Sequence, residues 1–214
     1  MKKLGKISIV VFALMALVVG IHSTGQAAVS NNLIFVPTAN IISNQGAIAG
    51  EMYGDLGRFE AVYRLDPRVE IGGEIISNDN GDSDIGPLLR ILFSRETADQ
   101  PAFAAGLRDK DLYATVSKSL GYGVNGHIGI GDGAFDGLFV GLNKVINPVS
   151  IEIDSDSDDR STTVTSSFPT TNLMVEYINQ KVNFGARINL QNTLNLDLGV
   201  LDLDEFKLGL NYGF

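Results

Sequence analysis

The chain has 214 residues, no cysteine and a formal net charge of −9. This length suits one domain of moderate size, and the lack of cysteine excludes a fold held by disulfide bonds. The acidic balance does not suit a protein that binds nucleic acid.

Residues 1–28 have the features of a secretory signal peptide. Lys2, Lys3 and Lys6 form a basic start, an apolar stretch runs to Gly20, and small residues precede Val29. This pattern is typical of a cleaved export signal, and the apolar stretch is short for a permanent membrane helix. We expect cleavage after Ala28. The mature chain then keeps all 25 acidic residues and loses three of its 16 basic ones, so its net charge becomes −12.

Beyond the signal, residues 29–45 are predicted to form an extended N-terminal segment, and residues 46–214 alternate between apolar and polar or small residues. Successive side chains of a strand face opposite sides, so this period of two predicts strands with one apolar face. The predicted strands are 46–54, 57–65, 67–77, 86–95, 101–108, 111–120, 122–131, 137–146, 171–179, 181–190, 194–202 and 205–214. Each has about the nine to eleven residues with which a tilted strand crosses a bilayer.

The predicted fold is therefore all-β: a single antiparallel up-and-down transmembrane β-barrel of about twelve strands. A range of ten to fourteen is kept because residues 32–36 and 149–153 could each add a strand. Most connections are tight, but residues 77–86 and the acidic loop 154–160 are longer. A bacterial barrel of this kind has an even number of strands and both ends in the periplasm, so twelve strands place the second loop on the side where turns are usually short.

The polar face of these strands is expected to line the lumen, because the apolar face meets lipid. The lumen-facing candidates are Arg58, Glu60, Arg64, Glu70, Glu74, Arg90, Arg108, His127, Glu176, Arg187 and Lys207. Such mixed charge fits either a selective polar channel or a lumen filled by ion pairs, since charges inside a narrow barrel must be paired.

Catalytic, cofactor and metal sites are not predicted. His127 is the one histidine of the mature chain, so a hydrolase with a Ser-His-acid site would have to use it, and no nucleophile is marked by its spacing. There is no Cys/His cluster for a metal. The acidic run at 154–160 lacks the glycine and the distal glutamate of an EF-hand, and it is interpreted as a solvated loop.

The chain ends on an alternating strand with Tyr212 and Phe214. This ending resembles the C-terminal signal that outer-membrane barrels present to the barrel assembly machinery. We therefore expect the cell outer membrane as location, with its lipid bilayer and the assembly machinery as partners.

Several short stretches resemble the YjbH-type outer-membrane family, which is linked to exopolysaccharide production and export. They are Val36-Pro37-Thr38-Ala39-Asn40 followed by Gly46, Val69–Gly73, Pro101–Arg108, Val116-Ser117-Lys118, Gly126–Gly133, Gly137–Gly141, and Val175-Glu176-Tyr177 leading into Val182–Leu190. The resemblance implies a barrel with a structural or export role around surface polysaccharide, with polysaccharide or export proteins as partners. It supplies no catalytic residues.

Two alternatives stay open beside that role. One is a general porin or small-solute channel, and the other is a secreted soluble β-protein that binds a ligand. Conductance in a planar bilayer separates the first from a structural barrel, and extraction without detergent would favour the second.

Overall fold

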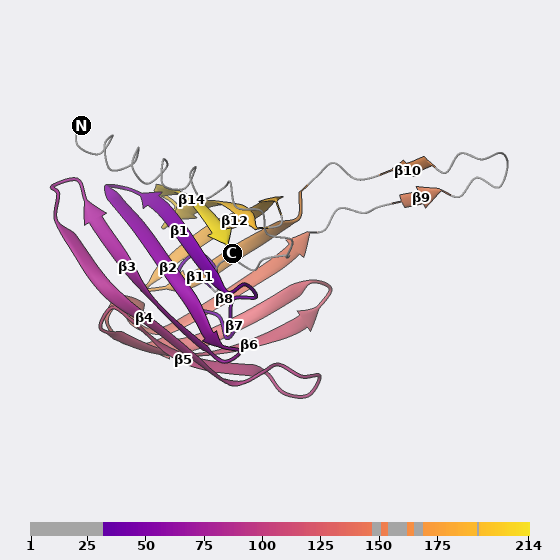
Figure 1. Cartoon of the computed structure of the whole chain (residues 1–214), viewed down its shortest axis with the longest axis horizontal. Coiled ribbons are helices and arrows are strands. Elements are labelled where there is room, and N and C mark those ends of the chain that lie inside the picture. The colour runs from indigo at the N-terminus through magenta and orange to yellow at the C-terminus, as the bar shows by residue number, and fades with distance from the viewer. Residues whose placement is uncertain (1–31, 147–150, 154–161, 165–168, 192) are drawn as a thin grey trace.

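The computed structural model describes residues 32–146, 151–153, 162–164, 169–191 and 193–214. Twelve strands form one closed antiparallel barrel (Figure 1). They are β1 (Gly46–Tyr53), β2 (Leu56–Asp66), β3 (Val69–Asn78), β4 (Ser83–Ser94), β5 (Ala102–Arg108), β6 (Asp111–Gly121), β7 (Val124–Gly131), β8 (Gly137–Ile146), β11 (Thr171–Ile178), β12 (Lys181–Gln191), β13 (Leu194–Leu201) and β14 (Glu205–Gly213). The predicted fold class and strand number are confirmed. The predicted signal peptide, residues 1–28, lies outside the described residues.

The barrel closes where β1 pairs with β14. Ala47 lies opposite Gly213, and the backbone groups of Gly46 and Phe214 exchange two hydrogen bonds of 3.0 and 2.9 Å. Every other strand of the barrel pairs with its neighbours in the sequence, except that β8 pairs with β11. Closure leaves no strand edge with unpaired backbone groups.

The strands place apolar side chains outside and a different set inside. In β8, Leu138, Val140 and Leu142 are exposed, whereas the alternate residues Phe139, Gly141 and Asn143 are buried. The same alternation exposes large apolar side chains around the whole barrel, among them Ile71, Phe103, Ile128, Tyr177, Phe184 and Leu208. The exterior is therefore apolar, as expected of a wall that faces hydrocarbon.

The two ends of the barrel differ. At one end, which we call the turn end, short connections join the strands. Asn179 and Gln180 both have positive φ, of 50° and 60°, as a two-residue type I′ hairpin requires. The predicted long loop at 77–86 is also short, because β3 continues to Asn78 and β4 begins at Ser83. The side chain of Asn78 tightens this turn by accepting the amides of Asn80 and Asp82, each at 3.1 Å.

The other end, which we call the terminal end, holds the start of β1, the end of β14 and the connection from β8 to β11. Part of that connection forms a separate two-stranded sheet, β9 (Ile151–Ile153) with β10 (Thr162–Val164), which extends away from the barrel (Figure 1). The possible strand at 149–153 is thus no part of the barrel. The predicted acidic loop, residues 154–160, lies outside the described residues. Within the part of the chain that is described, no helix is long and apolar enough to cross a membrane.

The prediction that residues 32–36 could add a strand to the barrel is wrong. These residues do not pair with the barrel, and their one ladder contact is an isolated bridge between Asn32 and Pro37. Instead they lie inside the lumen, where Leu33, Ile34 and Val36 are buried. The apolar run suits a strand or a buried turn equally well, and the barrel is already closed without it.

Candidate functional site: a lumen occupied by the N-terminal segment

Residues 32–43, which we call the plug, fold back on themselves inside the barrel. The backbone amide of Leu33 donates to the carbonyl of Val36 at 2.9 Å, which closes a tight turn. This turn lies toward the turn end, because Phe35 packs edge-on against Tyr53 at 5.4 Å between ring centroids. The plug then runs back to the terminal end, where Gly46 begins β1. It therefore spans much of the length of the lumen.

One carboxylate holds the tip of the plug. Glu176 on β11 accepts the consecutive backbone amides of Ile34, Phe35 and Val36 at 2.9 to 3.1 Å. Asn183 on β12 donates to the other side of the same carboxylate at 2.9 Å. Glu176 is 2% exposed, so its negative charge is satisfied almost entirely by these amide donors.

Cationic side chains hold the carbonyls of the plug. Lys207 donates to the carbonyl of Ile34 at 2.9 Å, and Arg187 donates to the carbonyls of Asn32 and Leu33 at 3.3 Å. Arg90 binds the side-chain oxygen of Asn32 at 2.9 Å. The backbone amides of the plug thus donate to a carboxylate of the barrel wall, and its backbone carbonyls accept hydrogen bonds from cationic side chains of the wall.

The returning part of the plug is fixed in the same way. Thr115 donates to the carbonyl of Pro37 at 3.0 Å, and the amide of Ala39 donates to Ser117 at 2.7 Å. The amide of Ile42 binds Glu70. Arg64 donates to the carbonyls of Ile42 and Ser43 at 3.0 and 2.7 Å, close to the point where the chain enters β1.

Ser117 belongs to a buried chain of polar groups. Its hydroxyl lies 2.7 Å from Nδ1 of His127, whose Nε2 lies 2.8 Å from the oxygen of Asn143. Asn143 donates in turn to Asn172 at 2.8 Å. The amide oxygen of Asn143 accepts, so Nε2 of His127 carries the proton and Nδ1 accepts the serine hydroxyl. Ser117 also accepts a hydrogen bond from the backbone amide of Ala39. The hydrogen-bonded network of Asn172, Asn143, His127 and Ser117 therefore contacts the plug and helps to hold it in place.

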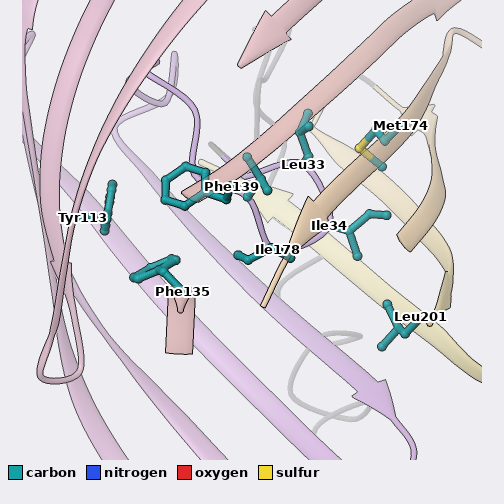
Figure 2. Packing of buried hydrophobic residues seen from close by; sticks show 9 residues of the cluster. Leu33, Ile34, Tyr113, Phe135, Phe139, Met174, Ile178 and Leu201 are labelled. Carbon is teal, nitrogen blue, oxygen red and sulfur yellow. The ribbon is translucent and has the colours of Figure 1, made fainter. Parts of the chain in front are cut away.

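Apolar packing completes the seat of the plug. Leu33, Ile34 and Val36 share one buried cluster with Tyr113, Phe135, Phe139, Met174, Ile178 and Leu201, and Figure 2 shows the plug residues among these inward side chains. Two inner-face glycines make room for them. A Cβ on Gly185 would lie 2.8 Å from Ile34, and a Cβ on Gly141 would collide with Leu33. The lumen wall is thus shaped to this segment.

A second group of predicted lumen residues forms an ion-pair cluster beside the plug. Arg58 lies 2.5 Å from Glu74 and 3.4 Å from Glu60, and Arg108 lies 2.9 Å from Glu60. Arg58 is also 3.8 Å from Glu51. These side chains fill their side of the lumen with mutually compensated charge.

The structure places the predicted lumen residues in three groups. Arg64, Glu70, Arg90, Glu176, Arg187 and Lys207 contact the plug; Arg58, Glu60, Glu74 and Arg108 form the ion-pair cluster; and His127 lies in the polar chain. Sequence reasoning missed Thr115, Ser117 and Asn183, because an uncharged inner residue looks like any other polar position of a strand. Tyr212 is buried and stacks with Phe214 at 6.5 Å, beside the closing seam of the barrel.

A sizeable cavity lies on each side of the plug, lined by described residues. The one at the terminal end measures about 970 Å³ and is bordered by Leu33, and the one at the turn end measures about 330 Å³ and is bordered by Phe35. The two share no lining residue. In the described part of the chain, no cluster of three histidine, aspartate or glutamate side chains could hold a metal ion.

No family model and no curated protein matches this chain. Solved structures do resemble it. The KdgM porin superposes with a TM-score of 0.54 at 9% sequence identity, over 79% of this chain and 98% of the porin. A KdgM porin in complex with disordered oligogalacturonate gives 0.48 at 10% identity, over 79% and 98% of the two chains. The outer membrane protein Omp33 of Acinetobacter baumannii gives 0.44 at 9% identity, over 80% and 98%. The first of these likenesses shows that the fold is that of a porin barrel.

Proposed function

We propose that this chain is an outer-membrane channel of the porin type whose lumen is closed in the resting state by residues 32–43. The observation that carries the proposal is the plug itself: a segment of the same chain, seated between two cavities in the lumen of a barrel with an apolar exterior. The barrel supplies a polar path through a bilayer, and the plug decides whether that path is continuous.

The exterior supports a membrane location. Large apolar side chains such as Leu138, Ile128 and Phe103 face outward on strands of the closed barrel, and their exposed fractions are 57%, 48% and 39%. In water this surface would be a wide apolar patch, which soluble proteins avoid. In a bilayer the same apolar surface contacts hydrocarbon, and the closed sheet pairs its backbone groups internally, as a membrane-spanning structure requires. This argues against the secreted soluble alternative.

The location is tested by fractionation and gel mobility. We expect the protein to leave outer membranes only with detergent, and to migrate differently before and after boiling, as a folded barrel does. Recovery in a detergent-free soluble fraction would overturn the membrane location.

The channel is tested by planar-bilayer conductance. The wild-type protein should be closed for most of the recording with brief openings, because the plug has to leave its seat. A variant in which residues 32–43 are replaced by a Gly-Ser stretch of equal length should stay open with large steps. Equal current from both proteins would show that the plug does not control the path.

A second candidate is a structural or export barrel associated with surface exopolysaccharide, as the resemblance to the YjbH-type family implies. The occupied lumen favours it, because a barrel that serves as a scaffold does not need an open path. Wild-type protein that never conducts, together with loss of surface polysaccharide when the gene is deleted, would support this candidate over the channel.

The C-terminal strand is proposed to engage the barrel assembly machinery through Tyr212 and Phe214. Their position at the β1–β14 seam supports this, since the last strand must be presented before the barrel closes. Phe214→Ala should lower the folded fraction in outer membranes while refolding in detergent is unchanged. An equal loss of folded protein in outer membranes and in detergent would show that Phe214 stabilises the barrel rather than engaging the assembly machinery.

A further inference from the structure

The cavity at the terminal end carries an excess of positive charge. Of its charged lining residues, Arg64, Arg95, Lys118 and Arg187 are cationic, and Glu96 is the acidic one. This is unexpected in a chain with a net charge of −9.

The cavity at the turn end has the opposite balance. Its charged lining consists of Lys181 against Asp202, Asp204 and Glu205. Opposite charge at the two ends of one lumen means that the cationic cavity is a local feature rather than a property of the whole wall.

Two of the cationic groups have no acidic partner among the described residues. Arg187 forms a bidentate ion pair with Asp197, in which Nε and Nη2 each lie 2.8 Å from a carboxylate oxygen. Lys118 lies 3.7 Å from Glu96. Arg64 and Arg95 donate only to carbonyls, the latter to Pro67 at 3.2 Å, and among the described residues no carboxylate lies within 4.0 Å of either guanidinium. Their charge is therefore available to an anion in the cavity.

Amide side chains supply the rest of the lining. Asn125, Asn143, Asn172, Asn189 and Asn195 border the same cavity from five different strands. An amide both donates and accepts hydrogen bonds, which matches a ligand with many hydroxyl groups. A cavity of about 970 Å³ has the size of a site for a small molecule.

We propose that the terminal-end cavity binds a small, hydroxyl-rich carboxylate, with Arg64 and Arg95 as the groups that receive its charge. This inference rests on the proposed channel function and names the class of solute that the channel takes. The arginines set the preference for an anion, and the asparagines set the preference for hydroxyl groups.

The same site is coupled to the plug. Arg64 is bound to the carbonyls of Ile42 and Ser43, which lie just before β1. A carboxylate is a stronger partner for a guanidinium than a neutral carbonyl, so a bound anion competes with these two contacts. Binding of the solute therefore loosens the plug at the point where it joins the barrel.

The test uses gluconate and sorbitol, two probes of the same length that differ by a carboxylate in place of a hydroxymethyl group. In calorimetry on the full chain in detergent micelles, gluconate should bind at least tenfold more tightly than sorbitol. The variant Arg64→Gln/Arg95→Gln should lose most of this difference. Its control is Lys110→Gln/Lys181→Gln, which removes two positive charges at the turn end and should leave gluconate binding unchanged. Gel mobility before and after boiling checks that both variants are folded.

Equal affinity for the two probes would overturn the proposal, as would gluconate binding that survives the arginine substitutions or falls equally in the control. The measurement needs no conductance, so it can succeed where the channel proposal fails. In bilayers, gluconate should lengthen the openings of the wild type and not those of the arginine variant. If neither protein conducts, the channel proposal fails and the calorimetric result still decides the site.

Discussion

The carboxylate of Glu176 and the backbone amide of Val36 are joined by a hydrogen bond of 2.9 Å, although 140 residues separate them in the chain. The amides of Ile34 and Phe35 converge on the same carboxylate. One inner-face residue of β11 thus fixes the tip of a segment that precedes the first strand, and this contact carries the first prediction.

Glu176→Gln should loosen the plug. The amide keeps one oxygen but loses the charge, and its NH₂ group faces donors with which it cannot bond. A hydrogen bond to a charged group contributes about 1.5–3 kcal/mol, so we expect the open fraction in bilayer recordings to rise about tenfold or more. Glu205→Gln removes an exposed carboxylate at the turn end and should leave the recordings unchanged. An unaltered open fraction in Glu176→Gln would mean that the tip is not held by charge.

The strands could be predicted because each one carries its own signal. Alternation in β14 or β12 is a property of about ten neighbouring residues, and the barrel follows from repeating it around a closed sheet. The charged lumen candidates followed from the same rule, since they occupy the polar face of their strands.

The plug could not be predicted in this way, because its contacts join residues that are far apart in the sequence. The run Leu33–Val36 reads as apolar whether it adds a strand or fills a lumen. A weak local signal did exist on the wall. Phe139, Ile178 and Leu201 are apolar at inward positions, and each follows an apolar outward neighbour, which breaks the alternation. Such breaks mark the part of the inner face that packs against something apolar.

Gly185→Val should displace the tip of the plug. A Cβ at this position would lie 2.8 Å from Ile34 and 3.1 Å from the carbonyl of Leu198. Because the Leu198 carbonyl belongs to the hydrogen-bonded backbone of the neighbouring strand, the side chain of Ile34 has to move. We expect longer openings in bilayers and faster proteolysis within residues 32–43 of the folded protein.

The matched control is Gly73→Val, on the outward face of β3. A Cβ there meets its nearest atom at 3.5 Å, an ordinary contact. This variant should behave as wild type in both assays. Similar effects from the two substitutions would attribute the result to strand strain rather than to the plug.

A disulfide between the plug and the wall should lock the lumen. The chain has no cysteine of its own, and the side-chain oxygen of Ser117 lies 2.7 Å from the backbone nitrogen of Ala39. In Ala39→Cys/Ser117→Cys, oxidation should abolish the openings and a reducing agent should restore them. The single-cysteine variants should not respond to either reagent. Current that persists after the bond has formed would show that ions pass without movement of the plug.

The ion-pair cluster should matter more for stability than an exposed pair does. Arg58→Met removes the cation that Glu74, Glu60 and Glu51 share, and it leaves these three carboxylates with only Arg108 and Lys207 as ion-pair partners among the described residues. Removing one partner of a buried ion pair typically costs about 3–5 kcal/mol, so the urea midpoint for unfolding should fall clearly. Lys181→Met breaks the exposed pair with Asp202, whose side chains are 57% and 55% exposed, and should cost under about 1 kcal/mol. The double variant Arg58→Met/Glu74→Gln should recover part of the loss, because it restores the balance between buried negative and positive charge in the cluster. Equal midpoints for Arg58→Met and Lys181→Met would mean that water reaches the cluster and screens it.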